Sequence, residues 1–125
     1  VWAFDYDEKA GEIDLNSRRT VVDFTGFAPE EGGPDGMTVD AEGKLWVAQW
    51  GGCRVCRYDE ITGEKLMQVD VPAPCTSCPT FGGGKLDKLF ITTAGLGKEK
   101  FPEAGSLFVA DVGVCGRKAN RFGRE

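Results

Sequence analysis

The sequence predicts an all-β protein, and three observations support this fold class. Patterns with the helical period are scarce, glycine is abundant (18 of 125 residues), and turn-forming clusters recur about every 8–12 residues. Between the clusters lie short runs rich in valine, isoleucine, phenylalanine, tryptophan and threonine, which favour strands. The predicted strands cover residues 1–5, 20–24, 37–39, 45–49, 54–58, 66–71, 89–93 and 106–110.

An internal repeat organises these strands. The segment YDEKAGE at residues 6–12 recurs as YDEITGE at residues 58–64, and a third, degenerate copy ends its strand at Asp111. The spacing is 52 positions from Asp7 to Asp59 and again from Asp59 to Asp111. In each copy a strand runs into an aspartate, and the first two copies continue into a hairpin turn whose glycine can adopt a positive φ.

A second repeat interleaves with the first. KLWVA at residues 44–48 matches KLFIT at residues 88–92, 44 positions later, and the loop at residues 95–104 restores the missing length as an insertion. A period near 50 residues with about four strands is typical of β-propeller blades, and a propeller closes with about 4–8 of them. An open β-sandwich with a similar number of strands is the alternative.

The number of copies bears on domain organisation. The chain holds fewer than three copies of the repeat, and its first residues, VWAF, already have the pattern of a strand. We therefore expect residues 1–125 to be a portion of a single propeller domain. The blades needed for closure are expected to come from a longer chain or from further copies.

Composition argues against several classes of function. A net charge of −5 disfavours a nucleic-acid partner, and no apolar run approaches the roughly 18 residues of a membrane helix. The chain has no histidine, so acid–base chemistry must come from carboxylates, lysine, tyrosine or thiols. Five cysteines, an odd number, indicate reduced thiols and therefore a reducing, cytoplasmic compartment.

Two C-x-x-C pairs have the spacing of a zinc ribbon. Cys53 and Cys56 are separated from Cys75 and Cys78 by 18 residues. However, the first pair lies on a predicted strand, where residues three apart point to opposite faces. The repeat partner of that strand, at residues 1–6, contains no cysteine. Buried thiols are therefore the preferred interpretation, and a zinc-binding module is a third alternative.

An ordered series of motifs carries a family resemblance. The chain resembles the C-terminal half of the senescence marker protein, gluconolactonase and regucalcin-like family, from residue 1 to about residue 114. The motifs are FDYD at residues 4–7, PDGMTVDAEGKLWVA at 34–48, GGCRV at 51–55, TSC at 76–78, FGG at 81–83, LFITT at 89–93 and AGSLF at 104–108.

The resemblance implies a fold and a metal site. The fold is a six-bladed β-propeller, of which about two and a half blades are present as its C-terminal portion. Family members bind one divalent metal ion at the mouth of the central channel through a glutamate, an asparagine and an aspartate from different blades. Asp35 matches the aspartate, whereas the other two positions lie upstream of Val1. Members hydrolyse sugar lactones, and some are described as calcium-handling proteins.

The residues themselves leave two interpretations of Asp35. In Gly33-Pro34-Asp35-Gly36, the proline and glycine positions suit a type I turn in which aspartate is common. Alternatively, aligning Thr38 with Thr80 places Asp35 on Ser77, so that both begin inner strands at the channel mouth. A carboxylate there suits Ca²⁺, Mg²⁺, Mn²⁺ or Zn²⁺ and could assist the attack of water as a general base.

The remaining candidates have secondary roles. Thr76 and Ser77 could offer hydroxyls to a polyol substrate, although such residues often satisfy backbone groups where a strand begins. Asp40 and Asp59 are interpreted as turn residues, and Trp46 as core between two blades.

Two functions follow from these residues. The leading hypothesis is metal-dependent hydrolysis of a small sugar lactone, which is a carboxylic ester hydrolysis, in the intact protein. Asp35 would be metal ligand and general base, and the isolated chain is expected to be inactive because its other ligands lie upstream. The alternative is a non-catalytic propeller fragment that serves as a binding or scaffold module.

Overall fold

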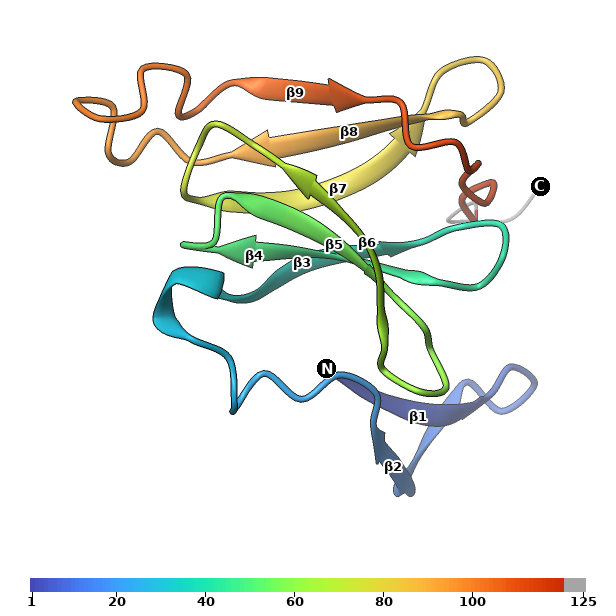
Figure 1. The fold of residues 1–125 in the computed structure, drawn as a ribbon. Coiled ribbons are helices and arrows are strands. Elements are labelled where there is room, and N and C mark those ends of the chain that lie inside the picture. The colour runs from blue at the N-terminus through green and yellow to red at the C-terminus, as the bar shows by residue number, and fades with distance from the viewer. Residues whose placement is uncertain (121–125) are drawn as a thin grey trace.

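The computed structural model describes residues 1–120, which form strands and one short 3₁₀ helix (Figure 1). All paired strands are antiparallel, which confirms the all-β prediction. No helix in the described part of the chain is long and apolar enough to cross a membrane. The elements are β1 (Trp2–Asp7), β2 (Glu12–Thr20), η1 (Pro29–Glu31), β3 (Gly33–Val39), β4 (Leu45–Trp50), β5 (Arg54–Tyr58), β6 (Lys65–Asp70), β7 (Thr76–Gly82), β8 (Lys88–Thr93) and β9 (Leu107–Ala110).

The strands form three successive sheets, which Figure 1 shows as layers stacked one above the other. The first contains β1 and β2, the second β3-β4-β5-β6 in that order, and the third β7-β8-β9. The sequence repeats map onto this order, because β1 and β2 correspond to β5 and β6, and β3 to β5 correspond to β7 to β9. The three sheets are therefore the outer two strands of one blade, one complete blade, and three strands of the next. This is a partial β-propeller, as predicted.

The structure corrects two of the predicted strands. The strand expected at residues 20–24 is absent, and β2 instead covers Glu12–Thr20, an exposed and mostly polar segment. Strand β7 extends from Thr76 to Gly82, whereas the sequence predicted only that an inner strand begins near Ser77, and it includes Pro79 although proline usually argues against a strand. Pro79 is tolerated because β7 pairs only with β8 within the described residues, so its missing N–H breaks no second ladder.

Two apolar clusters hold the sheets together. The larger one lies between the second and third sheets, where Trp46 packs edge-on against Phe81 with ring centroids 5.9 Å apart and joins Leu89 and Ile91. This confirms Trp46 as core between blades. The smaller cluster lies between the first and second sheets and contains Cys56 and Tyr58. Each sheet thus buries a face against the next, as propeller blades do.

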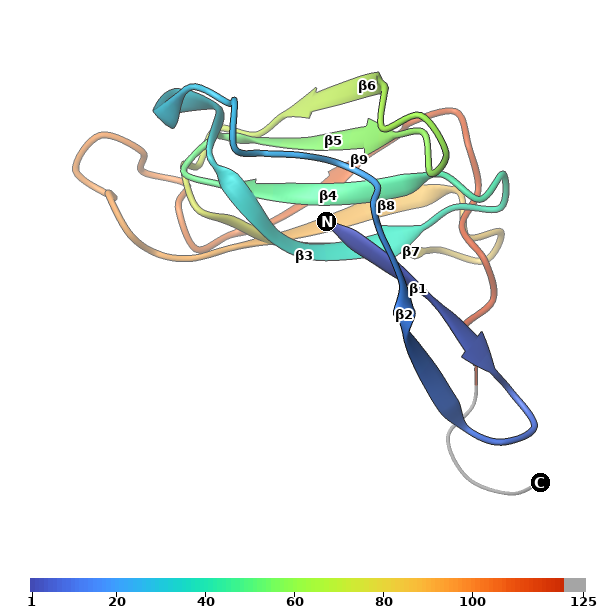
Figure 2. The same ribbon diagram turned by 90° about the horizontal axis from the view of Figure 1, so that it is seen from below.

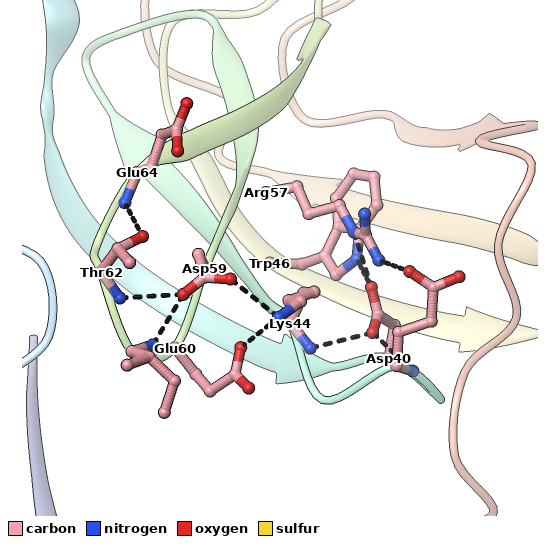
Figure 3. Close-up of polar contacts among 10 residues, drawn as sticks. Asp40, Lys44, Trp46, Arg57, Asp59, Glu60, Thr62 and Glu64 are labelled. Atoms are coloured by element: carbon pink, nitrogen blue, oxygen red, sulfur yellow. Dashed lines mark hydrogen bonds and ion pairs between the residues drawn. The ribbon is translucent and has the colours of Figure 1, made fainter.

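Ionic contacts fix the hairpin turns at one end of the sheets (Figure 3). Asp59 accepts hydrogen bonds from the backbone N–H groups of Ile61 and Thr62, which confirms it as a turn residue. Its second oxygen lies 2.8 Å from Lys44 Nζ, and this hydrogen bond holds the pKa of Asp59 well below its usual range. The corresponding lysine and aspartate of the third sheet, Lys88 and Asp111, form the same pair at 2.5 Å.

Asp40 is a turn residue with an additional role. One of its oxygens accepts from the backbone N–H groups of Glu42 and Lys44. The other accepts from Arg57 Nε at 2.8 Å and Trp46 Nε1 at 2.9 Å (Figure 3). Burial by itself would raise the pKa of Asp40, but these hydrogen bonds outweigh it and leave the pKa below its ordinary value.

Candidate functional site

The two inner strands begin together at one end of the sheets, called here the mouth end. Strands β3 and β7 lie next to each other. The pairing of β3 with β4 shifts between Pro34 and Met37, and the pairing of β7 with β8 shifts between Thr76 and Cys78. Each inner strand therefore has a β-bulge near its start, a feature that bends a strand and re-aims a side chain.

The bulges place Asp35 and Ser77 at equivalent positions. Asp35 lies between the two paired residues of the first bulge, and Ser77 lies between those of the second. Beyond the bulges, Met37 pairs with Val47 just as Pro79 pairs with Ile91. The pairing therefore gives the same alignment that the sequence repeats predicted.

The turn interpretation of Asp35 is wrong. Gly33-Pro34-Asp35-Gly36 is part of strand β3, and Gly36 does not have a positive φ. The aspartates of real turns in this chain, such as Asp7 and Asp59, accept hydrogen bonds from the backbone N–H groups two and three positions later. Among residues 1–120, the exposed carboxylate of Asp35 forms no hydrogen bond or ion pair. Its charge is therefore available to a partner outside the described residues.

Glycine at position 36 is required by the neighbouring strand. A Cβ atom on Gly36 would lie 2.5 Å from the Ser77 carbonyl oxygen and 2.8 Å from Cys78 Cβ. Both contacts are shorter than atoms of these types tolerate, so only glycine allows β3 to approach β7 this closely. The close approach brings the Asp35 backbone beside Ser77.

The segment before Asp35 rests on the β4–β5 turn, residues 51–53. Gln49 Nε2 donates to the Glu31 carbonyl oxygen at 2.9 Å. Gly32 adopts φ +76°, and a Cβ atom there would lie 2.5 Å from the backbone nitrogen of Gly52. Because two backbone segments are in contact at this point, the residues that lead into β3 have little freedom to move. The β4–β5 turn therefore helps to fix the position of Asp35.

The two candidate substrate residues lie in different surroundings. Thr76 is fully buried, and its hydroxyl lies 2.9 Å from both the Gln49 and the Arg54 carbonyl oxygens. Ser77 is half-buried, and its Oγ lies 2.8 Å from Thr92 Oγ1. Of the two hydroxyls, Ser77 is therefore the one open to an approaching molecule, and Thr76 joins the two blades.

Sequence reasoning missed Thr92 as a member of this group. The exposed Thr92 hydroxyl also lies 3.2 Å from the Cys78 carbonyl oxygen. If its proton goes to that carbonyl, the Ser77 proton points to Thr92, and both hydroxyl oxygens keep lone pairs for a ligand. The repeat alignment of residues 44–48 with 88–92 places Thr92 on Ala48, and this change from apolar to polar was the signal available.

A large cavity of about 810 Å³ adjoins the same end but is built differently. It lies between the first sheet and the start of β3, and its lining includes Trp2, Phe24, Phe27 and Trp50. Strand β1 has a paired neighbour on one side only within the described residues. The cavity therefore borders β1, a strand with an unpaired edge among residues 1–120.

The described residues do not form a complete metal site. Residues 1–120 contain no group of three or more cysteine, aspartate or glutamate side chains placed to hold a metal ion. The two C-x-x-C pairs do not converge, since Cys56 is buried between the first and second sheets and Cys78 is exposed. Asp35 is suited to be one oxygen ligand, and any further ligands must come from outside these residues.

Comparisons with known proteins show the family. The model of the SMP-30/Gluconolactonase/LRE-like region matches residues 1–95. The chain is 47% identical over 123 residues to regucalcin of Danio rerio and 42% identical over 122 residues to regucalcin of Homo sapiens. Each match covers 93% of this chain but only 40% and 39%, respectively, of the relative. The chain thus spans about two-fifths of the length of the curated relatives it matches.

Solved structures give the same result. The fold matches a luciferin-regenerating enzyme with a TM-score of 0.81 at 33% identity. It matches a calcium-binding protein, regucalcin, from Agrobacterium tumefaciens with a TM-score of 0.81 at 31% identity. Both matches cover 93% of this chain and 39% of the other. The chain belongs to the SMP-30/gluconolactonase/LRE-like family.

Proposed function

We propose that this chain provides the C-terminal blades of a metal-dependent sugar lactonase in which Asp35 is a metal ligand. The observation that carries the proposal is the state of the Asp35 carboxylate. It is exposed, it is raised on a bulge where an inner strand begins, and no group among residues 1–120 neutralises it. The carboxylates of Asp7 and Asp59, by contrast, accept from backbone N–H groups of their turns, so the free carboxylate of Asp35 supports a role in binding.

The residues at the mouth end would have separate roles in binding and hydrolysis. One oxygen of Asp35 would bind a divalent ion such as Ca²⁺, Mg²⁺, Mn²⁺ or Zn²⁺. When bound, such an ion polarises a lactone carbonyl and lowers the pKa of a coordinated water. The second oxygen of Asp35 would accept a proton from the attacking water as general base. Ser77 would receive a substrate hydroxyl, and Thr92 would hold Ser77 in place.

Further blades are part of this proposal. Trp2, Ile13 and Leu15 are exposed on the first sheet, and Leu107 and Val109 on the third. Large apolar side chains of this kind are normally covered when a propeller closes. We propose that further blades, from the same polypeptide or from additional copies, cover these faces and supply the remaining metal ligands. The unpaired cysteines are compatible with a reducing compartment, and we propose the cytoplasm.

The test is Asp35→Asn in a protein that contains all blades, since this change removes the charge and keeps the shape. We expect lactone hydrolysis with added Mn²⁺ or Ca²⁺ to fall about 100-fold or more, because a ligand and a base are both lost. Metal affinity measured by calorimetry should fall with it. Glu64→Gln, at an exposed carboxylate beyond the opposite turn, is the matched control. Unchanged hydrolysis and metal affinity in Asp35→Asn would refute the proposal.

The alternative is a non-catalytic binding or scaffold module. The incomplete ligand set among residues 1–120 favours it for the isolated chain. The two functions differ in one measurement. A protein with all blades that binds a divalent ion but hydrolyses no sugar lactone would be such a module.

A further inference from the structure

Two cysteines that the proposed activity does not use lie on neighbouring segments at the mouth end. Cys53 is the last residue of the β4–β5 turn, and Cys75 directly precedes β7. The Pro74 carbonyl oxygen accepts from Gly51 N at 2.8 Å and from Cys53 N at 3.4 Å. Val71 N donates to the Cys53 carbonyl oxygen at 2.8 Å. The turn is therefore bound at several points to the segment that carries Cys75.

These contacts limit the separation of the two cysteines. Cys53 N is 3.4 Å from the oxygen of the residue before Cys75. With standard bond lengths, the two Cα atoms are at most about 8 Å apart, and only a fully linear arrangement would reach that limit. Disulfides usually join Cα atoms about 4.4–6.8 Å apart. The next residues on each side, Arg54 and Thr76, are in direct contact at 2.9 Å, so the segments stay together beyond the pair.

The backbone at Cys53 gives an independent indication. Cys53 adopts φ +54°, in the left-handed region that favours glycine. A residue with a side chain is strained there, and the chain nevertheless has a thiol at this position. The other cysteines are poor partners for Cys53, because Cys56 packs between the first and second sheets and Cys78 lies against Gly36 on β3.

We propose that Cys53 and Cys75 form a reversible disulfide under peroxide, which joins the β4–β5 turn to the start of β7. The half-buried Cys53 thiolate attacks the peroxide oxygen, giving a sulfenic acid and hydroxide. The Cys75 thiol then attacks that sulfur, the S–S bond forms, and water leaves. In sum, two thiols lose two electrons and two protons, and one hydrogen peroxide becomes two waters.

The surroundings set the rate and the consequence of this step. Burial raises the pKa of Cys53, and the nearby Arg54 guanidinium offsets only part of this effect, so the reaction should accelerate as pH rises. The bond would tie the second sheet to the third beside Asp35 and Ser77. The proposal does not depend on the lactonase function, and its test needs no activity measurement.

The test is peptide mapping of the full chain after peroxide treatment and alkylation of the remaining thiols. Trypsin cleavage after lysine and arginine places Cys53 in the peptide of residues 45–54, and Cys75 together with Cys78 in the peptide of residues 66–85. We expect these two peptides to be joined, with a mass 2 Da below their sum, and to separate on reduction. The Cys78→Ser variant should keep the joined species, which assigns the bond to Cys75.

Two further variants make the test decisive. Cys53→Gly suits the positive φ and should abolish the joined species without impairing folding. Cys115→Ser removes an exposed thiol elsewhere and should leave it unchanged. Oxidation should also raise the melting temperature by several degrees in the wild type and not in Cys53→Gly. Failure of the two peptides to join, or joining that Cys78→Ser abolishes, would overturn the proposal.

Discussion

Removal of the Asp40 carboxylate tests how much this buried group contributes to the stability of the second sheet, β3 to β6. Asp40 has no exposed surface, and four N–H groups donate to its two oxygens. In Asp40→Ala the buried indole N–H of Trp46 loses its acceptor, which costs about 1–3 kcal/mol. The turn N–H groups lose a cap, which costs about 0.5–2 kcal/mol.

The cation of Arg57 adds to this loss but is not isolated. Arg57 keeps Glu42 as a partner at 2.6 Å, and that carboxylate is 61% exposed. Removing one member of a buried ion pair usually costs about 3–5 kcal/mol. The remaining partner places the total near this range rather than above it. We therefore expect Asp40→Ala to lose about 3–5 kcal/mol, a large share of the roughly 5–15 kcal/mol that stabilises a typical domain.

Asp59→Ala is the matched control because Asp59 also caps a turn and pairs with a cation. Its pair is partly exposed, at 22% for Lys44 and 19% for Asp59. We expect a clearly smaller loss than in Asp40→Ala, mostly from the cap. Urea unfolding followed by circular dichroism gives both values. Equal losses in the two variants, or less than about 1 kcal/mol for Asp40→Ala, would refute the account of Asp40 as a buried charged centre.

Two further predictions concern the inner strands and acid stability. Gly36→Ala should push β3 away from β7, since its Cβ atom would lie 2.5 Å from the Ser77 carbonyl oxygen. The variant should lose about 1–3 kcal/mol of stability and much of any activity that depends on Asp35. Unchanged stability would contradict this prediction, and Gly33→Ala, where a Cβ atom meets open space, is the control. The pKa of Asp59 is lowered in the folded state, so its stabilising contribution is present above the unfolded pKa near 3.8 and is lost as pH falls through the folded value. Urea midpoints should therefore fall below pH 4, and the fall should be smaller in Asp59→Asn.

The sequence was informative at the inner strands, where two segments share a pattern. The equivalence of Asp35 and Ser77 followed from two strands of like pattern, and the strand pairing confirms it. Strand β2 was missed because its apolar side chains, Ile13 and Leu15, are exposed and its other residues are polar. Strand propensity reflects how well a side chain packs on a half-buried sheet surface. A strand whose faces are exposed therefore has few of the residues by which strands are predicted.

Features that depend on distant partners could not be predicted. The local contacts of Asp40 are those of any turn aspartate, and only the fold brings Arg57, 17 positions later, to its second oxygen. Likewise Pro-Asp-Gly has the composition of a turn. It becomes a bulged strand because β7 lies beside it and Gly36 permits the approach. Tertiary contact thus adds to a correct local rule at Asp40 and overrides one at Asp35.

The repeated lysine–aspartate pair gives a reason to regard the first sheet as incomplete. In the second and third sheets, a lysine at the start of the second strand pairs with the aspartate at the end of the third, as Lys44 with Asp59 and Lys88 with Asp111. Asp7 ends the equivalent strand of the first sheet and caps the same turn through Lys9 N and Ala10 N. Among residues 1–120, no cation pairs with Asp7. We expect a lysine or arginine that pairs with Asp7 on a strand that would pair with the free edge of β1. This ion pair would then identify the correct register between that strand and β1.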